Sequence, residues 1–169
     1  MNHQLNRRAE DGFTLIELLI VMSVILILAT LSIPFMNSVI KKAHQASAET
    51  SLKDIVTQEN VYNSDYPEHG FTCTLSELGG KQGSGPPSPE AAQLIPEDLA
   101  SGFKAGYTFT ITSCSKQTVN NIDQVQSYKI TATPTSVGHS GDLGYCTDES
   151  GILYRDPKGG TNCTELVTH

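Results

Sequence analysis

An almost unbroken apolar run from Phe13 to Met36 dominates the pattern of hydrophobic and polar positions along this chain. About 24 helical residues at about 1.5 Å each span about 36 Å, which is enough to cross a bilayer. One carboxylate, Glu17, lies near the start of this run. Because an ionisable group at membrane depth costs about 2.5–3.5 kcal/mol, Glu17 is a candidate functional residue.

Helical spacing continues beyond the apolar run, with apolar positions confined to one stripe and most charged positions off it. We expect a single helix from Phe13 to about Asn63, roughly 75 Å long. Residues 13–36 would form its transmembrane or filament-core part, and residues 37–64 an amphipathic continuation. Pro34 should kink the helix, since proline lacks an N–H group and its ring clashes with the preceding turn.

Residues 65–102 are rich in glycine and proline and are expected to form a connecting loop. One short helix is predicted within this loop, from Pro89 to Ala100. Ser88 is a suitable N-cap for it, and proline is common at the first helical position. The rest of the loop should be irregular.

Alternating positions begin after Lys104 and predict strands in residues 103–169. Asn120-Asn121 lies between two alternating segments and suits a hairpin turn. We expect three or four antiparallel strands, with one face of the sheet packed on the distal half of the helix. The predicted fold class is therefore α+β, with a globular head over residues 65–169.

Four cysteines fall in the expected head, an even number that favours disulfides in an exported domain. Three connectivities are possible, and no C-x-x-C spacing indicates a zinc or redox site. Order along the chain favours Cys73–Cys114 and Cys146–Cys163. The first bridge would tie the connecting loop to the first strand, and the second would tie the C-terminal tail to the sheet edge.

Little in the sequence indicates catalysis or cofactor binding. His44, His69, His139 and His169 lie in different segments, without the H-E-x-x-H spacing of a zinc site, and no G-x-S-x-G motif occurs. Acidic residues near the C-terminus lack the spacing of a calcium loop, so a solvated acidic surface is the favoured interpretation. The net charge of −7 disfavours nucleic acid as a partner. We therefore predict no enzyme, no metal site and no cofactor.

The segment Gly12-Phe13-Thr14-Leu15-Ile16-Glu17, after a polar leader, resembles the class III signal of type IV pilins and of the pseudopilins of type II secretion. Pro34 stands where many such helices carry a proline. The resemblance implies the pilin fold and a leader over residues 1–12. It also implies cleavage between Gly12 and Phe13 by a prepilin peptidase, methylation of the new amine, and a role for Glu17 in assembly.

Three functions follow as alternatives. The resemblance implies a structural subunit of a type IV pilus-like extracellular filament, used in adhesion or motility. Its partners would be copies of itself, the peptidase, the inner-membrane assembly platform and, before assembly, lipid. A type II secretion pseudopilin is the alternative, because Tyr62, Tyr66-Pro67 and Gly70 resemble the start of the pseudopilin loop. A bacterial membrane-tethered binding or enzymatic domain is less favoured, since a plain anchor leaves Gly12-Phe13 and Glu17 unexplained.

Overall fold

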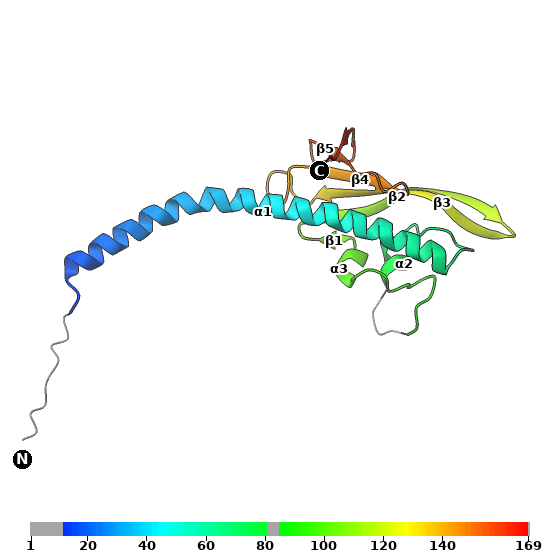
Figure 1. Ribbon diagram of the computed structural model, residues 1–169, viewed down its shortest axis with the longest axis horizontal. Helices are drawn as coiled ribbons and strands as arrows, with labels where there is room; N and C mark the ends of the chain where they lie inside the picture. The colour runs from blue at the N-terminus through cyan, green and yellow to red at the C-terminus, as the bar shows by residue number, and fades with distance from the viewer. Residues whose placement is uncertain (1–11, 81–84, 169) are drawn as a thin grey trace, which may run out of the picture. The chain divides into compact units, whose positions relative to one another are not determined.

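The computed structural model describes residues 12–80 and 85–168, and the side chains of residues 31–35 lie outside that description. The chain divides into two compact units, residues 1–38 and residues 39–169. Helix α1 (Leu15–Asp65) belongs to both units, whereas all other helices and strands that the structure describes belong to the second (Figure 1). Most of the expected leader falls outside the described residues. The side chain of Pro34 is not described, so the expected kink stays a prediction.

In the first unit, α1 presents exposed apolar side chains, from 82% exposure for Leu15 to 49% for Val24. Its sequence from Leu15 to Asp65 contains no glycine, which removes the commonest source of helix weakening. Across the described ranges 12–80 and 85–168, no helix combines the length and apolarity that a membrane crossing requires.

In the second unit, α1 buries one face. Its buried residues recur every three or four positions, as one helix face requires. They are Ala48, Ser51, Leu52, Ile55, Glu59 and Tyr62. The helix ends where Tyr66 donates its N–H to the Tyr62 carbonyl at 2.8 Å, because Pro67 has no N–H with which to continue the ladder.

Along the chain, two short helices follow α1 and precede the sheet. They are α2 (Leu75–Gly79) and α3 (Glu97–Ala100). The helix predicted from Pro89 to Ala100 is wrong over most of its length. Ser88 is not its N-cap but forms a bridge with Ala91, with N–H···O=C distances of 3.2 and 3.0 Å. Pro96, in an extended conformation, delays the helix to Glu97.

The sheet is a six-stranded antiparallel meander in which each strand pairs with the next along the chain. Two long central strands carry most of the pairing. The strands are β1 (Phe103–Lys104), β2 (Tyr107–Val119), β3 (Ile122–Pro134), β4 (Gly144–Asp148), β5 (Tyr154–Asp156) and β6 (Glu165–Leu166). The α+β fold class and the pilin fold, a long helix followed by an antiparallel sheet, are confirmed.

The strand number was predicted too low, at three or four instead of six. The two additional strands, β1 and β6, have two residues each, which is too short to show an alternating pattern. β6 pairs with β5 through Tyr154↔Leu166 and Arg155↔Glu165. Such short edge strands form where the fold places the chain beside a partner strand, and their own sequence does not predict them.

The predicted hairpin turn joins β2 to β3. Asn120 and Asn121 adopt φ of 52° and 66°, and Val119 pairs with Ile122 across them. Positive φ at both central residues is the signature of a type I′ turn, which asparagine tolerates better than most residues. A register shift between Thr112 and Ser115 marks a bulge in β2.

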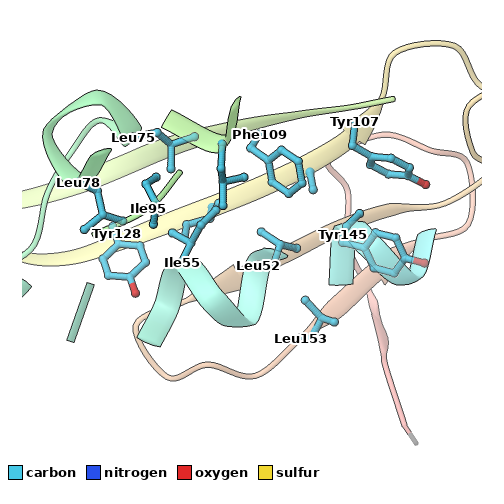
Figure 2. Packing of buried hydrophobic residues seen from close by; sticks show 14 of the residues in the cluster. Leu52, Ile55, Leu75, Leu78, Ile95, Tyr107, Phe109, Tyr128, Tyr145 and Leu153 are labelled. Atoms are coloured by element: carbon cyan, nitrogen blue, oxygen red, sulfur yellow. The ribbon is translucent and has the colours of Figure 1, made fainter. Parts of the chain in front are cut away.

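The core of the second unit lies between α1 and one face of the sheet (Figure 2). Leu52 and Ile55 contribute from α1, Leu75 and Leu78 from α2. The sheet side supplies side chains at alternating positions, as one face of each strand requires. These are Tyr107, Phe109, Tyr128, Ile130, Ala132 and Tyr145.

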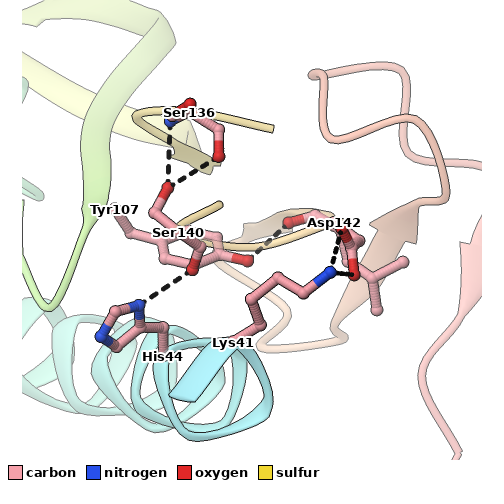
Figure 3. Close-up of polar contacts among 7 residues, drawn as sticks. Lys41, His44, Tyr107, Ser136, Ser140 and Asp142 are labelled. Atoms are coloured by element: carbon pink, nitrogen blue, oxygen red, sulfur yellow. Dashed lines mark hydrogen bonds and ion pairs between the residues drawn. The ribbon is translucent and has the colours of Figure 1, made fainter. Parts of the chain in front are cut away.

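The loop between β3 and β4 is held on α1 by polar contacts (Figure 3). Lys41 donates to both carboxylate oxygens of Asp142, at 3.1 and 2.9 Å, and His44 Nδ1 lies 3.0 Å from the Ser140 carbonyl oxygen. The Lys41 and Asp142 side chains are 25% and 51% exposed, so their ion pair is worth about 0–1 kcal/mol. It orients the loop more than it stabilises the head.

Two disulfides join Cys73 to Cys114 and Cys146 to Cys163, with Cα atoms 6.0 Å apart in each pair. These are the pairs expected from order along the chain. Cys114 lies in the bulged part of β2, and its bridge ties the segment before α2 to the sheet. The second bridge returns the C-terminal tail to β4.

Removing either bridge should destabilise the head, and the bridge that closes the longer loop should have the larger effect. The separations are 41 and 17 residues, which predict losses of about 4 and about 3 kcal/mol in the chain-entropy model. Urea unfolding of Cys73→Ser/Cys114→Ser and Cys146→Ser/Cys163→Ser, followed by circular dichroism in detergent, measures both. An unchanged unfolding midpoint after chemical reduction of the wild type would contradict the prediction.

Candidate functional site

The start of α1 is organised by a reciprocal pair of residues, Thr14 and Glu17. Thr14 Oγ1 accepts the Glu17 N–H at 3.3 Å, and the Glu17 carboxylate accepts the Thr14 N–H at 3.0 Å. The Thr14 hydroxyl also donates to that carboxylate at 2.6 Å. Together these contacts form a capping box, which satisfies backbone N–H groups that the first helical turn leaves free.

Only one oxygen of the Glu17 carboxylate is used by this capping box. Both hydrogen bonds from Thr14 end on Oε2. Neither of the two ion pairs found within the described part of the chain, Lys41–Asp142 and Arg155–Glu165, involves Glu17. The box therefore fixes the direction of the carboxylate and leaves Oε1 able to accept a further donor.

The apolar side chains around the capping box are exposed. Phe13 is 84% exposed, and large apolar residues remain about half exposed or more from Leu15 to Leu28. Soluble monomers rarely expose a contiguous apolar surface of this extent, and such surfaces mark contact with protein or membrane. Glu17 is the sole carboxylate in that stretch.

Gly12 and Phe13 directly precede the capping box. A Cβ atom built on Gly12 meets no heavy atom within 4 Å among the described residues. Packing in this structure therefore does not explain the glycine. Gly12, Phe13 and Glu17 are brought together by the local chain alone, whereas the four cysteines lie in the second unit and Pro34 lies outside the described side chains.

Sequence reasoning missed two polar arrangements. Thr14 and Glu17 have the Thr-x-x-Glu spacing of a capping box, a signal that was available in the sequence. Thr74 and Glu77 have the same Thr-x-x-Glu spacing. The Thr74 hydroxyl accepts the Glu77 N–H at 3.3 Å and caps α2. The second arrangement is the buried carboxyl of Glu59, whose position on the apolar stripe of α1 was the available signal.

Over residues 12–80 and 85–168, no three His, Cys, Asp or Glu side chains are grouped so that they could hold a metal ion. His44 is engaged with the backbone carbonyl of Ser140 at 3.0 Å. What the arrangement at the start of α1 offers instead is an oriented carboxylate on an apolar, exposed helix.

Comparison with protein families identifies the prokaryotic N-terminal methylation motif over residues 7–33. This match covers the Gly12-Phe13 junction, the capping box and most of the apolar run. Comparisons with curated proteins and with solved structures gave no match. The match spans only this N-terminal segment, and together with the pilin fold it supports a type IV pilin-like or pseudopilin-like precursor.

Proposed function

We propose that the chain is the structural subunit of a type IV pilus-like extracellular filament. The observation that carries this proposal is the methylation motif over residues 7–33, which includes the start of α1 with its oriented Glu17 carboxylate and its exposed apolar surface. The subunit waits in the bacterial inner membrane as a single-pass protein with its head on the periplasmic side. It is then added to the filament base by the inner-membrane assembly platform.

Processing in this proposal precedes assembly. A membrane-embedded prepilin peptidase cuts between Gly12 and Phe13, and the new Phe13 amine is methylated. Glycine has no Cβ, so its backbone enters a narrow protease cleft in an extended form. The subunit's own chemistry is self-recognition, not catalysis.

A pseudopilin of a type II secretion system is the second candidate. It shares the same motif, and the sequence Tyr66-Pro67 after α1, with Gly70 beyond it, resembles the start of the pseudopilin loop. The two disulfides and the long connection between α1 and the sheet favour the pilus. Two experiments distinguish these candidates. Electron microscopy of cells with native expression should show long surface filaments if the chain is a pilus subunit. Deletion of a pilus subunit should leave type II secretion intact.

Gly12→Val should leave a full-length, unassembled precursor, because a branched side chain cannot enter the protease cleft. Since no described atom lies within 4 Å of a Cβ at this position, the added Cβ meets no clash in the described structure. N-terminal sequencing and mass spectrometry of the membrane fraction measure the result. The wild type should begin at methylated Phe13.

The matched control is Glu10→Gln, which changes the leader but keeps the Gly12–Phe13 bond. It should be processed like the wild type. A wild-type protein that begins at any residue other than Phe13, or a Gly12→Val protein that is cut normally, contradicts the proposed processing.

A further inference from the structure

An acidic side chain lies at the centre of the head's core. Glu59 projects from the buried face of α1 and is 0% exposed. Both of its carboxyl oxygens meet Thr72, a residue of the connecting segment that is itself 2% exposed. The Thr72 N–H donates to Oε2 at 2.9 Å, and Thr72 Oγ1 lies 2.5 Å from Oε1. The pair therefore joins α1 to the segment that follows it, 13 residues further along the chain.

Among the residues that the structure describes, no positive charge is paired with this carboxyl. The ion pairs found in the described part of the chain are Lys41–Asp142 and Arg155–Glu165, and neither includes Glu59. An ionised carboxylate held in an apolar core without a cation is strongly disfavoured, and such a group takes up a proton instead. The geometry thus favours the neutral acid.

The hydrogen-bond pattern around Thr72 depends on the protonation state of Glu59. Thr72 Oγ1 also lies 3.2 Å from the backbone carbonyl oxygen of Thr74. A hydroxyl has one proton, so it donates either to Glu59 or to Thr74. When Glu59 holds a proton, it donates to Thr72 and Thr72 donates to Thr74, which satisfies all three groups. When Glu59 is ionised, Thr72 donates to it, and the Thr74 carbonyl keeps only the helical N–H that it accepts as the N-cap of α2.

Among the groups that lie near Glu59, the Glu77 carboxylate opposes its ionisation. Glu77 of α2 adds negative charge, and its own carboxylate accepts the Cys73 N–H at 3.3 Å. Tyr128 approaches from β3, and its buried hydroxyl has no hydrogen-bond partner in the described residues. Tyr62, on the same helix, donates to the Pro89 carbonyl at 2.9 Å. Burial and the charge of Glu77 raise the pKa of Glu59 to about 7, although the hydrogen bonds from Thr72 lower it.

We propose that Glu59 and Thr72 form a pH-sensitive latch, which holds the connecting segment on α1 while the carboxyl is protonated and releases it on ionisation. The segment carries the Cys73 bridge and the start of α2, so release loosens that end of the head. A filament subunit built in this way has a tighter head on the acidic side of neutrality.

The direction of the pH dependence follows from proton linkage. The pKa of Glu59 is higher in the folded head, at about 7, than the ordinary value of 4.5. The folded form therefore holds more protons between these values, and its stability falls as pH rises through this window. The latch is fully closed below pH 4.5 and contributes no further change above the folded pKa.

A carboxyl titration tests the protonation directly. The full chain in detergent micelles, labelled with 13C-glutamate, gives one carboxyl resonance per glutamate, and through-bond correlation assigns that of Glu59. Its midpoint should lie near pH 7. A Glu59 midpoint at the ordinary value, near pH 4.5, overturns the proposal without the need for any variant.

Hydrogen exchange at the Thr72 and Cys73 amides tests the release. After correction for intrinsic rates, the wild type should lose protection by up to about tenfold per pH unit between the two pKa values. Glu59→Gln should keep its protection at pH 5.5 and pH 8.5, because glutamine offers an N–H to Thr72 Oγ1 and a carbonyl to the Thr72 N–H. Equal loss of protection in wild type and Glu59→Gln overturns the latch.

Glu49→Gln is the matched control for these measurements. Glu49 lies on the same helix and interacts with the buried Tyr145 hydroxyl, whereas the hydrogen bonds of Thr72 go to Glu59. This variant should show the wild-type loss of protection at Thr72 and Cys73. If Glu49→Gln removes the pH dependence as Glu59→Gln does, the effect reflects the helix charge in general and not the latch.

Discussion

Glu17→Ala should abolish filaments while leaving the subunit stable, processed and in the inner membrane. This expectation rests on the proposed filament function and on the capping box at the start of α1. The box directs the carboxylate through Oε2 and leaves Oε1 able to accept a further donor. In the proposed assembly, that donor is the newly cut Phe13 amine of a neighbouring subunit.

The size of the expected effect follows from the cost of the isolated charge. A carboxylate at membrane depth costs about 2.5–3.5 kcal/mol, and an amine at the same depth has a comparable penalty. The helix dipole relieves about 0.3–1 kcal/mol at the first turn, which does not cover this cost. Pairing between subunits relieves both groups at once.

The same pair sets the axial step of the filament. Apolar helix faces slide past one another, because lipid is as apolar as leucine and supplies no register. The amine reaches Glu17 only when the neighbouring subunit has the correct height. Loss of the carboxylate therefore removes both the attraction and the register.

Two variants and a control sharpen the test. Glu17→Gln keeps an acceptor for the Thr14 contacts but removes the charge, so it should also reduce filament number strongly. Ser23→Ala removes a polar group from the same exposed segment of α1, where the Ser23 hydroxyl donates to the Leu19 carbonyl at 2.7 Å, and should assemble normally. Filaments are counted by electron microscopy and by shearing. Wild-type abundance in Glu17→Ala cells would show that Glu17 is not needed for assembly.

Leu52→Ala should lower the free energy of unfolding of the head by about 2–5 kcal/mol. Leu52 is 0% exposed and belongs to the core cluster between α1 and the sheet. Truncation removes buried methyl groups and leaves a cavity that the surrounding side chains fill only in part. For a domain stabilised by about 5–15 kcal/mol, this is a large fraction.

Val61→Ala on the same helix is the control. Val61 is 38% exposed and lies off the buried stripe, so its truncation should change stability by less than about 0.5 kcal/mol. Urea unfolding in detergent under non-reducing conditions compares the two variants with the wild type. Equal effects of Leu52→Ala and Val61→Ala would contradict the assignment of the buried face.

The sequence alone predicted the elements whose information is local. The long helix follows from a continuous period near 3.6, and the hairpin from alternation on both sides of Asn120-Asn121. The methylation motif is likewise contiguous, so Gly12, Phe13 and Glu17 were recognisable without a structure. The Thr14–Glu17 capping box is equally local and was missed only because its Thr-x-x-Glu spacing was not used.

Tertiary structure alone decided the features that depend on distant partners. β1 and β6 are strands because neighbouring segments present paired backbone groups, since two residues carry no period of their own. Ser88 was a good N-cap by composition, but its backbone pairs with Ala91 instead. Glu59 was visible on the apolar stripe, yet only Thr72, from a segment beyond the helix end, determines that its carboxyl is buried and satisfied. Local spacing thus fixes periodic elements and contiguous motifs, whereas edge pairing and buried polar partners depend on contacts that no sequence window contains.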